Sequence, residues 1–242
     1  MMAFGKDITW SAEELRFNAA MVRGWIYFVV LVLFCLVIVG GATRLTHSGL
    51  SITEWKPLHG VIPPLNLAQW QEEFELYKRI PEYQLVNKGM SLAEFQNLFW
   101  WEWAHRLLAR AVGLIFAVPL FLFWITGRLP KGLGLPLVGV LALGGLQGFI
   151  GWWMVSSGVT LGEGMTAVAS YRLATHLGLA FVILGYLAWF MFLLGREERD
   201  LMQARRLKET KIFGMSTGLL HFAFLQILLG ALVAGIDAGR SY

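Results

Sequence analysis

The sequence predicts an all-α membrane protein, a polytopic bundle of transmembrane helices. Of its 242 residues, 57% are hydrophobic and only 15% are charged, whereas soluble domains carry about 25% charged residues. The 11 tryptophans suit the two interfaces of a membrane. Five apolar runs each approach the roughly 20 residues that a helix needs to cross a bilayer. These runs cover residues 24–43, 107–125, 133–155, 173–194 and 212–236.

Composition also excludes several classes of protein. The net charge of +4 is too small to indicate a nucleic-acid partner. The single cysteine, Cys35, cannot form an internal disulfide, and its apolar surroundings predict a small packing residue. Residues 1–23 carry mixed charge and no short apolar core, which argues against a signal peptide or a transit peptide. A bacterial cytoplasmic (inner) membrane is therefore the expected location, in preference to a mitochondrion.

Lys and Arg predict which side of the membrane each connection occupies. They gather between runs two and three and between runs four and five, whereas residues 156–171 contain neither. The positive-inside rule therefore places the N-terminus in the cytoplasm. The predicted parts are a cytoplasmic amphipathic N-terminus (1–23), a four-helix bundle (24–195) with an outer loop (44–101), a cytoplasmic linker (196–211), and the first helix of an incomplete second bundle (212–242).

Two capping boxes mark the starts of long helices. Ser11 with Glu14 precedes the first run, and Ser91 with Glu94 precedes the second. The second box predicts one helix over residues 92–124, whose first turns stand above the membrane.

The outer loop is predicted to be folded. Asn66 has the form of an N-cap, and Pro81 is expected to end the helix that Asn66 begins. Because a structured loop of this length usually has a function, we expect it to cover a site.

A weak internal repeat links the runs. Each of the two even runs has a histidine near its predicted outer end, at positions 105 and 176. In the odd runs, Gln147-x-x-x-Gly151 recurs as Gln226-x-x-x-Gly230, and Gly40…Gly49 recurs as Gly230…Gly239. The residues after the fifth run look like the start of another outer loop, so we expect that a second unit begins here and is not finished.

His105 and His176 are the strongest candidates for chemistry. Their runs are parallel, so the two side chains are predicted at the same depth under the outer face. Two neutral imidazoles in an apolar bundle are what a haem iron needs as axial ligands. Copper or zinc usually requires a third or fourth ligand, and none is evident. The alternative is two buried histidines that each bond a neighbour.

Glu102 lies one helical turn before His105 and shares its face. It is a candidate acid–base group, or a group that orients a water or His105; the alternative is a carboxylate paired with a nearby arginine. Arg106 and Arg172 are candidates for holding anionic groups such as haem propionates, against the alternative of arginines that reach the membrane interface.

Several long motifs resemble the haem A synthase family, in its cysteine-free class of alphaproteobacteria and mitochondria. The family's motifs match Gly40-Gly41-Ala42-Thr43-Arg44-Leu45-Thr46, Ser48-Gly49-Leu50-Ser51-Ile52, Glu54-Trp55-Lys56-Pro57, Trp101-Glu102-Trp103-Ala104-His105-Arg106 and Tyr171-Arg172-Leu173-Ala174-Thr175-His176-Leu177. The family has eight spans in two four-helix halves, which accounts for the repeat.

The resemblance implies an oxidoreductase that converts a methyl group of haem O to the formyl group of haem A, for cytochrome c oxidase. His105 and His176 match the histidine pair of the N-terminal half, where the substrate haem is expected, and Glu102 matches the family's essential carboxylate. A b-type haem is expected in the C-terminal half, on spans that this chain lacks. We therefore expect a fragment.

The implied partners are haem O, delivered by haem O synthase, an electron donor and the lipid bilayer. The identity of the donor and the oligomeric state, a homo-oligomer included, stay open. Two rival functions are a bis-histidine membrane cytochrome that transfers electrons and a transporter or non-enzymatic assembly protein with structural histidines.

Overall fold

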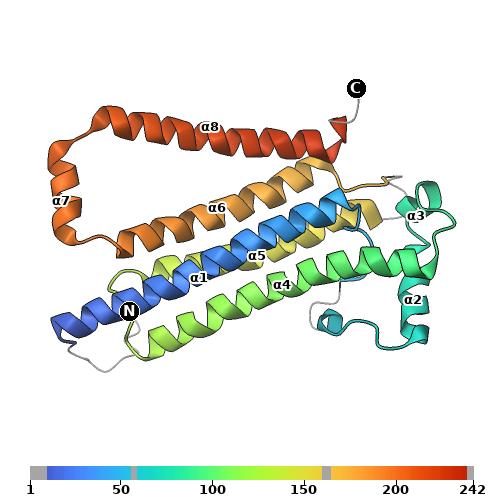
Figure 1. The fold of residues 1–242 in the computed structure, drawn as a ribbon, viewed down its shortest axis with the longest axis horizontal. Coiled ribbons are helices and arrows are strands. Elements are labelled where there is room, and N and C mark those ends of the chain that lie inside the picture. Colours follow the sequence, from blue (N-terminus) through green and yellow to red (C-terminus); the bar gives the residue numbers. More distant parts are fainter. Residues whose placement is uncertain (1–9, 56–58, 160–164, 239–242) are drawn as a thin grey trace. The chain divides into compact units, whose positions relative to one another are not determined.

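The computed structural model describes residues 10–55, 59–159 and 165–238, which are largely helical and contain no strand (Figure 1). Five of the described helices are long and apolar enough to cross a membrane. They are α1 (Ala12–Leu45), α4 (Leu92–Ile125), α5 (Gly134–Val159), α6 (Ser170–Leu194) and α8 (Thr210–Gly235). The predicted all-α membrane fold and its five spans are confirmed, and each of the five helices overlaps one predicted apolar run.

The shorter elements differ in part from prediction. The loop between α1 and α4 contains η1 (His59–Val61), α2 (Leu67–Tyr77) and α3 (Pro81–Leu85), and α7 (Glu198–Leu207) precedes α8. The prediction that Pro81 ends the first loop helix was wrong. That helix ends at Tyr77, and Pro81 begins α3, where its missing N–H leaves no bond unmade. The helix α7 lies in residues 196–211, which were predicted only as a linker.

The capping boxes are present as predicted. The Ser91 N–H donates to Glu94 Oε2 at 2.7 Å, and the Glu94 N–H donates to Ser91 Oγ at 3.3 Å. Ser11 and Glu14 make the same two bonds ahead of α1. Each box satisfies donors that a helix N-terminus leaves unpaired. Residues 12–23 form the first turns of α1.

Contacts divide the chain into two compact units, and α1, α4, α5, α6 and α8 each contribute one portion to both. The first unit comprises Met1–Phe34, Val112–Gly145 and Leu179–Gln226. Its core is aliphatic and includes Val22, Ile26, Leu137 and Leu187. The indole Nε1 of Trp25 donates to the Ile115 carbonyl at 2.9 Å, which satisfies a polar group inside this apolar core.

The second unit comprises Cys35–Ala111, Leu146–Gly178 and Ile227–Tyr242. Its core is aromatic, because α2 and α3 pack their rings on the first turns of α4. Phe74 stacks on Phe95 with ring centroids 5.0 Å apart, and Trp70 meets Phe99 edge-on at 4.9 Å. The loop is therefore folded, as predicted. All the candidate site residues named above lie in this unit.

The cap of α4 provides the first test. Ser91→Ala removes the side-chain acceptor for the Glu94 N–H, so we expect the protein to lose about 1 kcal/mol of stability. Thermal unfolding in detergent measures this as a lower Tm, and Ser91→Asp, which keeps an acceptor, serves as the control. Equal stability of Ser91→Ala and the wild type would contradict the assigned cap.

Candidate functional site

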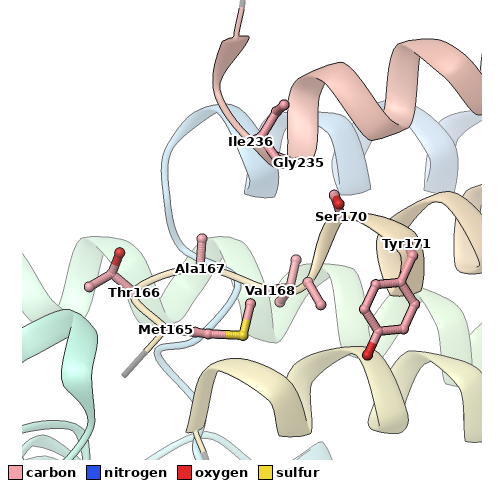
Figure 2. A pocket seen from close by; sticks show the side chains of 9 residues that line it. Met165, Thr166, Ala167, Val168, Ser170, Tyr171, Gly235 and Ile236 are labelled. Carbon is pink, nitrogen blue, oxygen red and sulfur yellow. The ribbon is translucent and has the colours of Figure 1, made fainter. Parts of the chain in front are cut away.

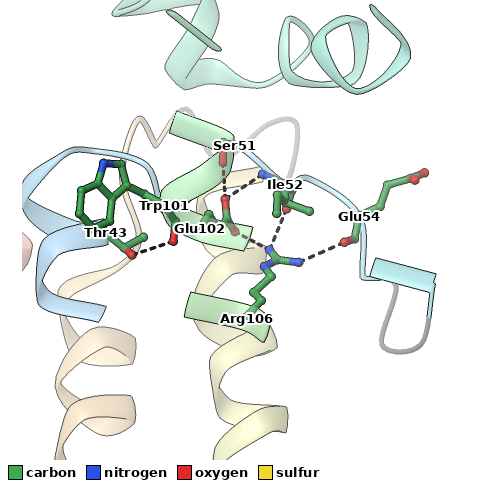
Figure 3. Close-up of polar contacts among 7 residues, drawn as sticks. All are labelled: Thr43, Ser51, Ile52, Glu54, Trp101, Glu102 and Arg106. Atoms are coloured by element: carbon green, nitrogen blue, oxygen red, sulfur yellow. Dashed lines mark hydrogen bonds and ion pairs between the residues drawn. The ribbon is translucent and has the colours of Figure 1, made fainter. Parts of the chain in front are cut away.

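Glu102 is a buried carboxylate that accepts three hydrogen bonds (Figure 3). Its side chain is only 3% exposed. The Ser51 hydroxyl donates to Oε2 at 2.7 Å, the Ile52 N–H donates to the same oxygen at 2.8 Å, and Arg106 Nη2 donates to Oε1 at 2.6 Å. Two oxygens of an ionised carboxylate can accept all of these bonds. The sequence left open whether Glu102 pairs with a nearby arginine, and the structure shows that it pairs with Arg106.

Arg106 links the same helix to the loop. Besides Glu102, its guanidinium donates to the Ile52 carbonyl at 2.8 Å and to the Glu54 carbonyl at 3.3 Å (Figure 3). Glu102 and Arg106 are four residues apart on α4, so they lie on one face of it. Together they connect the segment 51–54 to the turn of α4 that carries His105. We call this set of bonds the loop clamp.

His105 lies between the two clamp residues in sequence, but it does not bond Glu102 in the described part of the chain. Its imidazole instead lies against the backbone of α1. A Cβ added at Gly40 would lie 3.0 Å from His105 Nε2, which is closer than nearly all real contacts. Glycine at position 40 therefore leaves the space that the imidazole fills.

His176 has the matching arrangement on α6. A Cβ added at Gly151 of α5 would lie 2.9 Å from His176 Cε1. One turn earlier on α5, the Gln147 Nε2 lies 3.2 Å from His176 Nδ1 and donates to the His176 carbonyl at 3.0 Å. Gln147 and Gly151 are the pair that the sequence repeat singled out, and in this span they hold the candidate histidine.

The two histidines are half-buried. They do not bond each other in the described residues, and each ring tip points at a glycine of a different helix. The residue types are suited to binding a haem, because two imidazoles can serve as axial ligands of its iron. The two glycines lack the Cβ that would crowd the imidazole rings. No cluster of three or more His, Cys, Asp or Glu side chains suited to a metal ion occurs among the described residues.

Arg172, the remaining predicted residue, and the three other histidines of the chain are placed as follows. Arg172 donates to the Trp153 carbonyl at 2.8 Å and to Ser156 Oγ at 3.1 Å, and its guanidinium lies over the Trp153 ring. His47 is exposed, whereas the side chain of His59 lies outside the described residues. His221 bonds the Thr217 carbonyl of its own helix at 2.7 Å and is exposed.

A second buried carboxylate, Glu82, was not predicted. It is 5% exposed and accepts a hydrogen bond from the Tyr77 hydroxyl at 3.2 Å, while Asn87 Nδ2 donates to that hydroxyl at 2.8 Å. Burial raises the pKa of the Glu82 carboxyl to about 7; the bond from Tyr77 opposes this rise, the charge of Glu102 adds to it, and the charge of Arg44 opposes it. Sequence spacing gave no indication of this group, because α2 and α3 bring it inside.

A pocket in the second unit has none of the candidate site residues in its described lining, although its Tyr171 hydroxyl accepts a hydrogen bond from Arg172 Nε at 3.2 Å (Figure 2). Among its described lining are Met165, Thr166, Tyr171 and the end of α8 at Gly235 and Ile236. None of these is a carboxylate, a histidine or a basic residue. The candidate histidines, Glu102 and Arg106 are therefore not among the lining residues of this pocket.

The loop clamp can be tested by a double-mutant cycle. Glu102→Gln or Arg106→Met leaves the other group buried without its charged partner, so each is expected to cost about 3–5 kcal/mol of unfolding free energy. The double variant should cost clearly less than the sum of the two. The exposed pair Lys78–Glu75 is the matched control, with an expected coupling below about 1 kcal/mol. Additive effects at Glu102 and Arg106 would argue against the clamp.

Glu82 predicts a pH dependence of stability. Its pKa in the folded protein is raised from 4.5 to about 7, so the folded state binds a proton that the unfolded state has released. Below pH 4.5 the contribution of this proton to the free energy of unfolding is fully present. As the pH rises to about 7 this contribution is lost, which lowers the free energy of unfolding by about 3 kcal/mol in total. Thermal unfolding between pH 4.5 and 8 should show the decline in the wild type and in the exposed control Glu72→Gln, but not in Glu82→Gln. The same decline in Glu82→Gln would contradict the assignment.

Comparison with known proteins identifies the family. Residues 23–242 match the COX15-CtaA family model, described as cytochrome oxidase assembly protein. A protein named Heme A synthase from Ruegeria sp. (strain TM1040) is 66% identical over 221 residues, which cover 91% of this chain and 58% of that relative. Proteins with the same name from Roseobacter denitrificans and Rhizobium etli (strain CIAT 652) are each 59% identical, over 91% and 93% of this chain and 58% and 59% of the relatives.

The chain thus spans less than two thirds of the length of these relatives. No solved structure matches it. The family match covers nearly all of the chain and agrees with the resemblance found in the sequence. This chain belongs to the COX15-CtaA family of cytochrome oxidase assembly proteins.

Proposed function

We propose that the chain is part of a haem A synthase, an oxidoreductase of the bacterial cytoplasmic membrane with its N-terminus in the cytoplasm. Its substrate is haem O, on which one methyl group becomes a formyl group, and the product haem A serves cytochrome c oxidase. The names of its relatives, at up to 66% identity, support this activity. The change from CH₃ to CHO adds one oxygen atom, removes two hydrogen atoms and is a four-electron oxidation, so it requires an oxidant and a source of oxygen as well as proton transfer at the site.

The observation that carries the proposal is the placement of the two histidines. His105 and His176 come from different helices of one unit, and each lies against a glycine on a further helix. Neutral imidazoles are suitable axial ligands for the iron of the substrate haem. Gly40 and Gly151 leave room for the two imidazoles against α1 and α5, where a Cβ would crowd the rings.

Glu102 is the group proposed to handle protons. It is buried one turn from His105, and the Ser51 hydroxyl and the Arg106 guanidinium donate to its carboxylate at 2.7 and 2.6 Å. Positioned carboxylates of this kind transfer protons over hydrogen-bond distances. The loop clamp holds Glu102 in place and covers this turn of α4, which reduces access of water.

Arg106 and Arg172 are proposed to interact with the propionates of haem O. Both guanidiniums are already engaged by carbonyl groups, Arg106 by Ile52 and Arg172 by Trp153. A guanidinium has five N–H donors, so it can keep such bonds and still accept an anionic partner. Four further features are proposed for the whole protein. They are a b-type haem in the C-terminal half, delivery of haem O by haem O synthase, an electron donor and a homo-oligomeric state.

Haem extraction tests the function against its rivals. Purified protein is analysed by pyridine haemochrome and by extraction with identification of the haem type, for the wild type, His105→Ala and His176→Ala, with His47→Ala as control. We expect haem O, its hydroxylated form and haem A in the wild type and the control, and loss of these from both site variants. Haem B alone would support a cytochrome, and no haem would support an assembly protein without a cofactor.

A further inference from the structure

A group of large apolar side chains is exposed in the loop between α1 and α4. Its members are Val61, Ile62, Leu65 and Leu67. The side chains of Ile62 and Leu65 project furthest, since these residues are 67% and 75% exposed. We call residues 61–67 the loop tip. Single exposed apolar residues need no explanation, but a contiguous group indicates a surface that contacts something other than water.

The loop tip also lacks charged side chains. No Asp, Glu, Lys or Arg occurs between Lys56 and Glu72, whereas residues 72–94 carry both acidic and basic side chains. The core of the loop does not use the tip either, because α2 packs Trp70 and Phe74 inward and leaves Leu67 outside. The loop is thus divided into a charged part that suits water and an uncharged part that suits an apolar environment.

The backbone of the tip has few free hydrogen-bond donors. Pro63 and Pro64 have no N–H, and the Leu65 N–H donates to Gln69 Oε1 at 2.7 Å. These three consecutive residues therefore leave no backbone N–H unbonded. Asn66 Oδ1 accepts from the Gln69 N–H at 3.0 Å and so caps α2 beside them. Such pairing is what a lipid environment requires, because an unpaired N–H is costly in hydrocarbon.

The chain is attached to α4 on both sides of the tip. Before the tip, Arg106 of α4 donates to the carbonyls of Ile52 and Glu54, at 2.8 and 3.3 Å. After the tip, the Trp70 ring of α2 lies 5.6 Å from the ring of Trp100 on α4. The position of the tip along α4 is therefore restrained from both of its ends.

These attachments lie where the apolar run of α4 begins. This run starts at Leu107, and Trp100 and Trp101, about two turns earlier, are exposed. Exposed tryptophans beside an apolar span are typical of the membrane–water interface. Figure 1 shows η1, whose last residue is Val61, displaced from α2 along α4 in the direction of the apolar run. The tip thus lies at the level of the interface.

We propose that the loop tip inserts into the lipid leaflet on the side of this loop, as a membrane contact in addition to the five membrane-spanning helices. Apolar side chains at this level enter the boundary between headgroups and acyl chains. Because the loop clamp and α2 flank the tip, its insertion restrains the loop beside the turn of α4 that carries His105. The inference is independent of the proposed function, since it requires no haem.

The test places a fluorescent label in the tip of the full chain, in lipid nanodiscs of phosphatidylethanolamine and phosphatidylglycerol without other proteins. In a Cys35→Ser background, Leu65→Cys carries an environment-sensitive NBD group, and Lys88→Cys is the control from the charged part of the loop. At position 65 we expect quenching by lipids spin-labelled on the acyl chain and protection from aqueous iodide. The label at position 88 should show the reverse. Iodide quenching as strong at 65 as at 88 would overturn the proposal and leave this surface to a protein partner.

A second substitution tests the cause of the protection. Ile62→Asp places a charge in the tip, so the label at position 65 should become accessible to iodide. Leu85→Asp changes a similarly exposed residue outside the tip and should leave the label protected. Protection that persists in Ile62→Asp would place the label against protein and would also overturn the proposal. If Ile62→Asp does not fold, the comparison of positions 65 and 88 decides.

Discussion

The candidate site depends on how closely an imidazole can approach the backbone of a neighbouring helix. His105 rests on α1 at Gly40, and His176 rests on α5 at Gly151. A Cβ would lie 3.0 Å from His105 Nε2 at position 40 and 2.9 Å from His176 Cε1 at position 151, so the rings would have to shift. The two glycines therefore set where both histidines can lie, and every chemical role proposed for the pair follows from this packing constraint.

The loop clamp adds a polar constraint to the steric one. A buried carboxylate and a mostly buried guanidinium on one face of α4 are satisfied by each other and by the segment 51–54. Burying such charges is expensive unless they are paired and fully hydrogen-bonded. This buried charged pair lies at the helical turn of α4 that bears His105. In the same unit, aromatic side chains of α2 and α3 pack on the first turns of α4.

Much of the fold could be predicted because its determinants are local. Apolar length located the five spans, and the capping boxes at Ser11 and Ser91 located the starts of two of them. The short helices α3 and α7 were not predicted. A proline begins α3 and a charged run forms α7, and either signal can mark the end of a helix as well as its start. His105, His176 and Glu102 were recognised by residue type and family resemblance.

The partners of these residues could not be predicted, because they come from distant parts of the sequence. Ser51 and Ile52 reach Glu102 across 51 and 50 residues, and Gln147 reaches His176 across 29. Glu82 becomes buried only through the packing of the loop helices. The sequence repeat did point to Gln147 and Gly151, but as a pattern without a role. Their contacts with His176 become evident only when α5 and α6 are considered together.

The central claim is that the imidazoles of His105 and His176 bind one haem from its two faces. Electron paramagnetic resonance of the chain loaded with ferric haem O tests this most directly, because the spectrum depends on the axial ligands. The account predicts a low-spin signal of two imidazole ligands, which is lost in both His105→Ala and His176→Ala. A high-spin signal in the wild type, or a low-spin signal that survives either substitution, would contradict it.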